Sequence, residues 1–341
     1  MRAWPFLFAA ACGTPNAVDT ATGGYDTPPP GTVDTGPSAP PTETYANCRL
    51  ELASAFTQAG LMSTIRYLYD GNGVLIEREH DDDANGTVDF RDGYTYDGTG
   101  RLLTLINSAM SGTTVVSTIT TSYDSNGKAI HEVADSNLDG RADATIDWTY
   151  DAAQNLLRVE GDTDADGQEN YSQTWTFDAS GFLVAFANDI DGDGAPNDTW
   201  AYLNDVAGLA LVLTIDASND GSVNHRETFS YTPEGWLALQ EFDDTANGSV
   251  DSTLSWTWDA KGRIAVAFED MDADGDSDAE TDFDYDLADR LTEEELDLGA
   301  DGSTDIRWRW TYDGGGNLRH QEQDVLADGH VETYTDYAYG C

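Results

Sequence analysis

The hydrophobic and polar positions of this chain repeat every 27 residues from about residue 48 onward. Each repeat contains two large positions separated by a single residue, and the second of them is aromatic in ten of its eleven copies. Side chains two residues apart point to the same face of a β-strand, so each pair predicts a strand with one aromatic face. The copies of the second position are Tyr69, Tyr96, Tyr123, Tyr150, Phe177, Asn204, Tyr231, Trp258, Tyr285, Tyr312 and Tyr339.

A second strand follows the aromatic strand in every repeat. A glycine usually stands four residues after the second aromatic position, and an aliphatic residue or alanine stands two residues further on. This order predicts a tight turn and then an apolar strand. Residues 291–298 would pass for a helix in isolation, but their register in the repeat predicts a strand. The predicted class is all-β: tandem two-strand repeats forming one long antiparallel sheet, curled into a spiral, a shell or a closed barrel-like body.

The repeat core resembles the YD repeat of bacterial RHS and teneurin-type proteins. The likeness is carried by YTYDGTGRLL (94–103), WTFDASGFL (175–183), WTWDAKGRI (256–264) and WTYDGGGNL (310–318), and it covers roughly residues 48–341. The resemblance implies a continuous antiparallel sheet that spirals into a shell. This chain departs from the family in its longer period, since each unit carries an acidic loop. It also ends inside a repeat, which does not favour a toxin domain enclosed within the same chain.

The acidic loop is the second turn of each unit. In its five richest copies an acid or asparagine stands at positions 1, 3, 5 and 9, and glycine at position 6. Alternate carboxylates converge their oxygens on one point, and an oxygen-only site of this kind selects Ca²⁺ or Mg²⁺ over transition metals. The capacity for six to eight ligands favours Ca²⁺. The candidate metal ligands are Asp81, Asp83, Asn85, Asp89, Asp135, Asn137, Asp139, Asp143, Asp162, Asp164, Asp166, Asn170, Asp189, Asp191, Asp193, Asn197, Asp270, Asp272, Asp274 and Asp278.

These loops resemble the calcium loops of EF-hands, dockerins and thrombospondin type 3 repeats. They lack the bidentate glutamate at position 12 and the flanking helices of the EF-hand, and position 9 is a partial substitute. The alternative is a plain hairpin turn, which also favours Asp, Asn and Gly. A plain turn does not require acids at three alternate positions, whose charges repel one another. The copies with fewer acidic residues carry Ser218, Thr245, Gly299 and Leu326 at position 3.

Charge restricts the partners of this protein. The chain of 341 residues has 64 acidic and 16 basic side chains, a formal net charge of −48. Such a surface repels nucleic acid and anionic lipid headgroups. We therefore expect no nucleic-acid partner, membrane contact only through a lipid anchor, and a protein or glycan ligand at the cell surface. Five bound Ca²⁺ ions would neutralise ten of the excess charges.

The N-terminal residues predict export. Residues 1–12 combine a positive end, a short apolar stretch and small residues before Cys12, which is typical of a signal that ends at a lipid-accepting cysteine. The alternative is an ordinary secretory signal. Residues 13–47 are rich in Pro, Thr and Gly and predict a disordered tether. We expect an exported lipoprotein of the outer membrane or cell surface, facing the periplasm or the exterior.

Two further cysteines bracket the repeat domain, residues 48–341. Cys48 and Cys341 are an even pair suited to one disulfide in an oxidising compartment, the alternative being two free thiols. About 22 strands laid flat at about 4.8 Å would separate the ends by about 100 Å. A disulfide needs its α-carbons within about 7 Å, so the bond requires the sheet to close.

No catalytic signature stands out. The sequence contains no G-x-S-x-G, H-E-x-x-H, C-x-x-C or glycine-rich phosphate loop, and its five histidines share no position in the repeat. We expect no enzyme, no catalytic residue and no organic cofactor. The leading hypothesis is a calcium-binding repeat protein with a structural or binding role at the cell surface. The alternatives are an RHS-like shell component that encloses a polypeptide, and a surface protein that binds or acts on polysaccharide.

Overall fold

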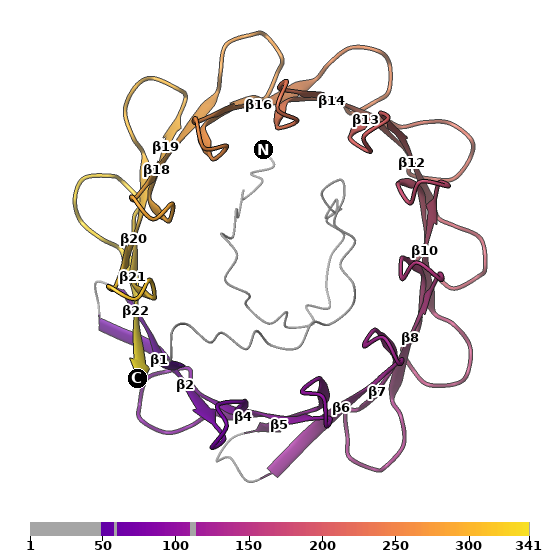
Figure 1. Cartoon of the computed structure of the whole chain (residues 1–341), viewed down its shortest axis with the longest axis vertical. Coiled ribbons are helices and arrows are strands. Elements are labelled where there is room, and N and C mark those ends of the chain that lie inside the picture. The colour runs from indigo at the N-terminus through magenta and orange to yellow at the C-terminus, as the bar shows by residue number, and fades with distance from the viewer. Residues whose placement is uncertain (1–48, 58–59, 110–113, 341) are drawn as a thin grey trace.

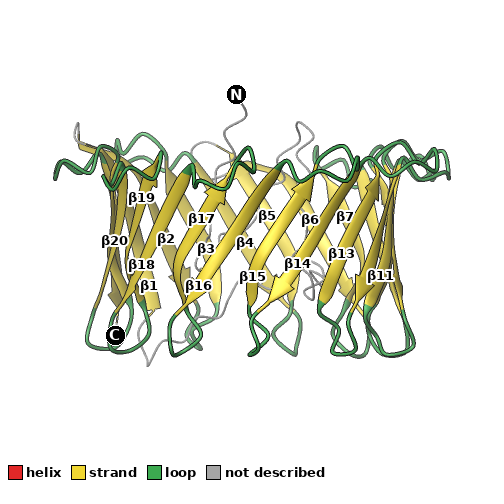
Figure 2. Ribbon diagram, turned by 90° about the horizontal axis from the view of Figure 1, so that it is seen from above, coloured by secondary structure: helices red, strands yellow, loops and turns green. Residues whose placement is uncertain are grey.

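The computed structural model describes residues 49–57, 60–109 and 114–340, and these form strands joined by short loops (Figures 1 and 2). No helix in this part of the chain is long and apolar enough to cross a bilayer. The predicted leader and tether, together with Cys12, Cys48 and Cys341, lie outside the described residues. Those assignments stay predictions.

The predicted two-strand repeat is confirmed along the described chain, including a strand over residues 291–298. Each odd-numbered strand from β3 to β21 begins at the aliphatic position, and each even-numbered strand from β2 to β20 ends at the second aromatic position or its equivalent. The strands are β1 (Arg49–Thr57), β2 (Gly60–Tyr69), β3 (Leu75–Asp81), β4 (Phe90–Tyr96), β5 (Leu102–Ala109), β6 (Thr114–Tyr123), β7 (Ala129–Asp135), β8 (Ala144–Tyr150), β9 (Leu156–Asp162), β10 (Tyr171–Phe177), β11 (Leu183–Asp189), β12 (Asp198–Asn204), β13 (Ala210–Asp216), β14 (His225–Tyr231), β15 (Leu237–Asp243), β16 (Ser252–Trp258), β17 (Ile264–Asp270), β18 (Ala279–Tyr285), β19 (Leu291–Leu298), β20 (Ile306–Tyr312), β21 (Leu318–Asp324) and β22 (Thr333–Gly340).

The sheet closes on itself. Every strand pairs antiparallel with its neighbours in sequence, and β1 also pairs with β22, from Arg49 against Gly340 to Thr57 against Thr333. Figure 1 shows the result as a ring in which the first and last strands lie side by side. Of the shapes that the sequence allowed, the closed barrel is the one that forms.

The core lies on one face of the barrel wall, which we call the aromatic face. Both aromatic positions of each repeat lie on it. Trp175, at the first of these positions, lies 5.3 Å between ring centroids from Phe186 of the next strand, and Phe186 lies 5.2 Å from Trp200. Trp200 and Leu213 are buried. A β-bulge at the second aromatic position of each aromatic strand adds a local bend, which suits a curved wall.

The second aromatic side chain also ties its strand to the preceding one. The hydroxyl of Tyr231 donates to the carbonyl oxygen of Ala210, the first residue of the preceding strand, at 2.8 Å, and the indole of Trp258 donates to the equivalent carbonyl of Leu237 at 2.8 Å. Asn204, which breaks the aromatic column in the sequence, donates its amide to the carbonyl of Leu183 at 2.7 Å. Hydrogen bonding across strands is therefore kept where aromaticity is lost.

Antiparallel pairing places the two kinds of connection at opposite ends of the barrel (Figure 2). We call the end with the acidic loops the acidic rim. Its nine fully described loops are residues 81–89, 135–143, 162–170, 189–197, 216–224, 243–251, 270–278, 297–305 and 324–332. We call the opposite end, where the aromatic strands stop, the turn rim.

Candidate metal centres at the acidic rim

The nine loops of the acidic rim share one backbone conformation. Position 6 is a glycine with positive φ in every copy, and position 4 is also left-handed, as at Ala84 (φ 53°) and Ala273 (φ 52°). Glycine adopts this conformation without steric cost, whereas alanine there is strained. Because a residue other than glycine takes this conformation in eight of the nine loops, the surrounding hydrogen bonds must hold it.

Those hydrogen bonds come from the side chains of positions 1, 5 and 9. In all nine loops the position 1 carboxylate accepts from the position 6 N–H at 2.6–3.0 Å. Position 5 accepts from the position 7 N–H at 2.7–2.9 Å. Position 9 accepts from the position 2 N–H at 2.5–2.8 Å. Three of the four predicted ligand positions therefore build the turn in every loop, and position 3 accepts from the position 5 N–H in three loops, at 2.9–3.2 Å.

Position 3 varies most between the loops, whereas positions 1, 5 and 9 keep an acid or asparagine in every copy. Among the described residues, three carboxylate oxygens come within 4.8 Å of one another in four loops. All four carry aspartate at position 3. The gathered groups are Asp81, Asp83 and Asp89; Asp162, Asp164 and Asp166; Asp189, Asp191 and Asp193; and Asp270, Asp272 and Asp278.

The fifth predicted loop behaves differently. Asp135, Asp139 and Asp143 do not form such a group within the described chain, although all three were candidate ligands. Asn137, at position 3, donates a hydrogen bond from its amide to Asp143 at 3.1 Å, so this side chain stabilises the turn. The backbone N–H of Leu138 also donates to Asp135 at 2.5 Å.

The remaining predicted ligands contribute to the turn rather than to a triplet. The amide oxygens of Asn170 and Asn197 accept from the position 2 N–H of their loops at 2.5 and 2.6 Å, and that of Asn85 accepts from Thr87 at 2.7 Å. Asp274 accepts from the N–H of Asp276 at 2.9 Å and lies outside the triplet of its loop.

One triplet contains a buried oxygen without a protein partner. Asp270 is only 9% exposed, and its Oδ2 accepts from Gly275 at 3.0 Å. Its Oδ1 is buried and makes no hydrogen bond. In the equivalent loop 216–224, Oδ1 of Asp216 accepts from two backbone N–H groups, those of Ser218 and Asp220, at 3.3 and 3.2 Å. A buried unpartnered carboxylate oxygen is costly, and a cation would satisfy it.

Sequence reasoning missed the ionisable groups on the aromatic face. Asp92 accepts from Arg78 at 2.7 Å and lies 3.1 Å from the ring nitrogen of His80. Burial alone would raise the pKa of Asp92, but His80 and Arg78 outweigh it and lower the pKa. Glu294 has Phe283 and Trp308 as cross-strand partners, and burial raises its pKa to about 7. The alternation of side chains along the strand could have identified Glu294, because it places this residue on the aromatic face.

Comparison with known proteins assigns neither a family nor an activity. No protein-family model and no curated protein matches the chain. Among solved structures, the TcdB2–TccC3 complex is 16% identical over 80% of this chain and 16% of that chain, with a TM-score of 0.40. The Photorhabdus luminescens Tc holotoxin pore is 15% identical over 82% of this chain and 18% of that chain, with a TM-score of 0.32.

A porin-like protein from Bacteroides uniformis is 10% identical over 85% of this chain and 98% of that chain, with a TM-score of 0.30. The present chain thus spans less than a fifth of the toxin chains that it matches. Because all of these scores are below 0.5, the likenesses carry no argument about function.

Proposed function

We propose that this chain is an exported, calcium-binding β-repeat protein with a structural or binding role at the cell surface, and that it is not an enzyme. Ca²⁺ at the acidic rim would fasten successive hairpins of the barrel. The observation that carries the proposal is the coincidence between aspartate at position 3 and a gathered carboxylate triplet. The buried, unpartnered oxygen of Asp270 supports it independently.

Calcium is the metal that the ligand chemistry favours. The triplets supply only carboxylate oxygens, which suit hard cations rather than transition metals. Each loop offers several carboxylates, each able to bind through one or two oxygens, which suits the six to eight ligands of Ca²⁺ better than the strict octahedron of Mg²⁺. The net charge of −48 adds to the attraction for any divalent ion.

A metal count on protein equilibrated with CaCl₂ tests the proposal. We expect about four tightly retained Ca²⁺ ions per chain by mass spectrometry, and loss of one in the Asp272→Ser variant. Ser218→Asp is the matched gain variant, because it introduces the missing position 3 carboxylate into a loop with the same backbone. A wild-type protein that retains no Ca²⁺ at millimolar concentration would refute the proposal.

The export and lipid-anchor part of the proposal rests on residues 1–12. Expression of the full chain in a bacterial host with radiolabelled palmitate should label the wild-type protein and leave Cys12→Ser unlabelled. Labelling of neither protein, with both secreted in soluble form, would replace the lipoprotein with an ordinary secreted protein.

A second candidate is a shell component that encloses a polypeptide, and closure of the wall is the observation that favours it. A barrel of 22 strands is roughly 40 Å across, wider than the side chains of its own wall can fill. Native mass spectrometry of protein purified from its own host would distinguish the two roles. A mass equal to the chain and its ions alone counts against a cargo.

A further inference from the structure

A hollow of about 370 Å³ opens beside the acidic loop 270–278. It lies on the face of the wall opposite the aromatic face, where three adjacent strands supply its floor. Glu241 of β15 pairs across with Thr253 of β16, which pairs in turn with Asp270 of β17. In the next row, Ser255 pairs with Phe268. The floor therefore combines a carboxylate pair, two hydroxyls and one aromatic ring.

Asp270 belongs both to this hollow and to the metal triplet. It lines the hollow, and its carboxylate gathers with those of Asp272 and Asp278. Its Oδ1 is buried and unpartnered. The triplet supplies three side chains to an ion that takes six to eight oxygens. Coordination positions thus remain for oxygens from elsewhere, and the hollow is the adjacent space from which a ligand can provide them.

We infer that this hollow is a calcium-dependent binding site for a polyhydroxylated ligand of the saccharide class; the inference rests on the calcium site proposed above. Neighbouring hydroxyls of a sugar would bind the ion, while Glu241, Thr253 and Ser255 hydrogen-bond others. The ring of Phe268 offers an apolar surface to the C–H face of the sugar. Few convergent polar groups beside an aromatic side chain are typical of small-ligand sites.

Charge favours a neutral ligand over an anionic one. Glu241 lies in the floor itself, and the chain carries a net charge of −48. A phosphate or carboxylate ligand would approach this surface against repulsion. A polyol supplies oxygen ligands without that cost, and its hydroxyls can both donate to Glu241 and accept from Thr253.

A second hollow two repeats earlier is a natural control. It measures about 380 Å³ and ends at the loop 216–224, which has no aspartate at position 3. At the positions equivalent to Glu241, Ser255 and Phe268 it has Ala187, Ala201 and Thr214. The second hollow thus lacks the carboxylate at the Glu241 position, the ring at the Phe268 position and the metal triplet, although Asp216, Phe186 and Trp200 also line it.

Isothermal titration calorimetry with the methyl glycosides of glucose, mannose, galactose and N-acetylglucosamine tests the inference on the full chain. In 5 mM CaCl₂ we expect binding of at least one glycoside to the wild type. Binding should weaken at least tenfold in EGTA, in Asp272→Ser and in Ser255→Tyr, which fills the hollow without touching the triplet. Ala201→Tyr, the same change in the second hollow, should bind like the wild type.

Calcium titration without sugar separates the two proposals. Normal Ca²⁺ binding with no glycoside bound, or with acetate bound instead, overturns the saccharide site and leaves the calcium proposal intact. Glycoside binding that survives EGTA or Ser255→Tyr also overturns the site. Absence of Ca²⁺ binding overturns both. Circular dichroism of each variant shows whether a loss reflects misfolding, and Ser255→Ala, which removes only a hydroxyl, should then show a partial loss.

Discussion

The two rims of the barrel handle aspartate in different ways. At the turn rim, the first turn residue accepts from backbone N–H groups two and four residues on, as Asp313 does from Gly315 and Asn317 at 2.8 and 2.9 Å. Several of these turns also contain an arginine: Arg263 donates to Asp259 at 2.7 Å and stacks 4.3 Å from the ring of Tyr285. In these turns the positive charge that pairs with the aspartate is therefore supplied by the chain itself.

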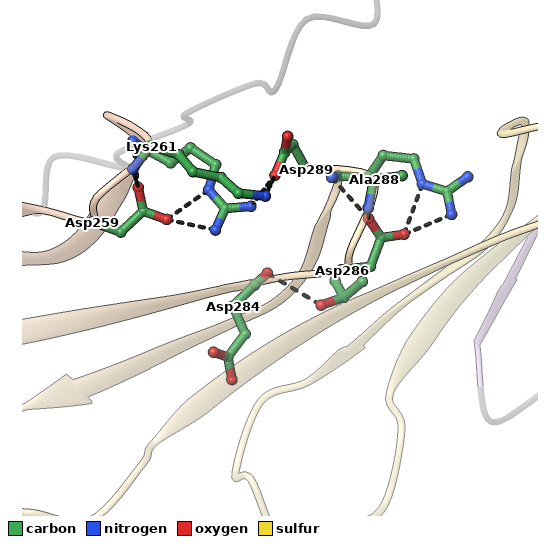
Figure 3. Close-up of polar contacts among 9 residues, drawn as sticks. Asp259, Lys261, Asp284, Asp286, Ala288 and Asp289 are labelled. Atoms are coloured by element: carbon green, nitrogen blue, oxygen red, sulfur yellow. Dashed lines mark hydrogen bonds and ion pairs between the residues drawn. The ribbon is translucent and has the colours of Figure 1, made fainter.

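Figure 3 shows how neighbouring turns share charges at this rim. Asp289 of one turn accepts from Lys261 of the preceding repeat, and Asp259 and Asp286 each face into their own turn. The acidic rim has no equivalent in its four triplets, where carboxylate oxygens face each other. The turn rim thus supplies its own positive partners, whereas the proposed function has the acidic rim take a cation from solution.

Removal of calcium should have the largest effect, and it should act on the acidic rim alone. At a tenfold excess of Ca²⁺ over Kd, each site contributes roughly 1.4 kcal/mol, so four sites contribute roughly 6 kcal/mol. We expect EGTA to lower Tm by about 10 °C. Calorimetry in CaCl₂ and in EGTA measures the difference. An unchanged Tm would contradict the claim that calcium stabilises the acidic rim.

Glu294 is a third kind of carboxyl, because among the described residues it has no arginine or lysine partner and belongs to none of the carboxylate triplets. Because its folded pKa of about 7 lies above the unfolded value of about 4.3, the folded state binds the extra proton. Its contribution is complete below pH 4 and is lost as pH rises through 7. Glu294→Gln should therefore stabilise the protein by about 1–2 kcal/mol at pH 8 and by little at pH 4. Urea unfolding at both pH values measures this, and equal effects at both would show that the carboxyl is ionised.

Exchange of position 3 between matched loops sharpens the comparison within the acidic rim. Asp272→Ser should remove one ion and about 1.4 kcal/mol of calcium-dependent stability, and Ser218→Asp should add the same. Both changes should have almost no effect in EGTA. Tm measured in the two conditions gives the result. A loss in Asp272→Ser that persists in EGTA would assign this residue to the turn instead of the ion.

Asp259→Asn tests the turn rim and should have the smallest effect. The backbone and then the side chain of Arg263 lower the pKa of Asp259 to about 2. The stability from its charge is present above the unfolded pKa of about 3.9 and is lost as pH falls through about 2. We expect Tm to fall by about 1–2 °C at pH 7, independently of calcium, and by nothing near pH 2. A calcium-dependent loss of Tm would show that the turn rim and the acidic rim do not act independently.

Much of the local structure could be predicted from the sequence because it depends on short-range rules. Alternation placed Trp175 and Phe177 on one face, and the turn glycines marked the ends of hairpins. The acidic pattern found the loops that gather carboxylates, and the side chains at its positions 5 and 9 also hold the turn. Those side chains accept from N–H groups of their own loop, as Asn197 does, and composition does not distinguish a turn-building Asx residue from a ligand.

The 27-residue period by itself determined the strands, their order and the two kinds of turn, because each follows from residues close in the chain. Only the tertiary structure decided that β1 pairs with β22, since closure depends on twist and bend summed over the whole sheet. It also decided that Glu241, Thr253 and Asp270 share one floor, and that Oδ1 of Asp270 is buried without a partner. These facts depend on neighbouring strands and on solvent exclusion, which no single repeat contains.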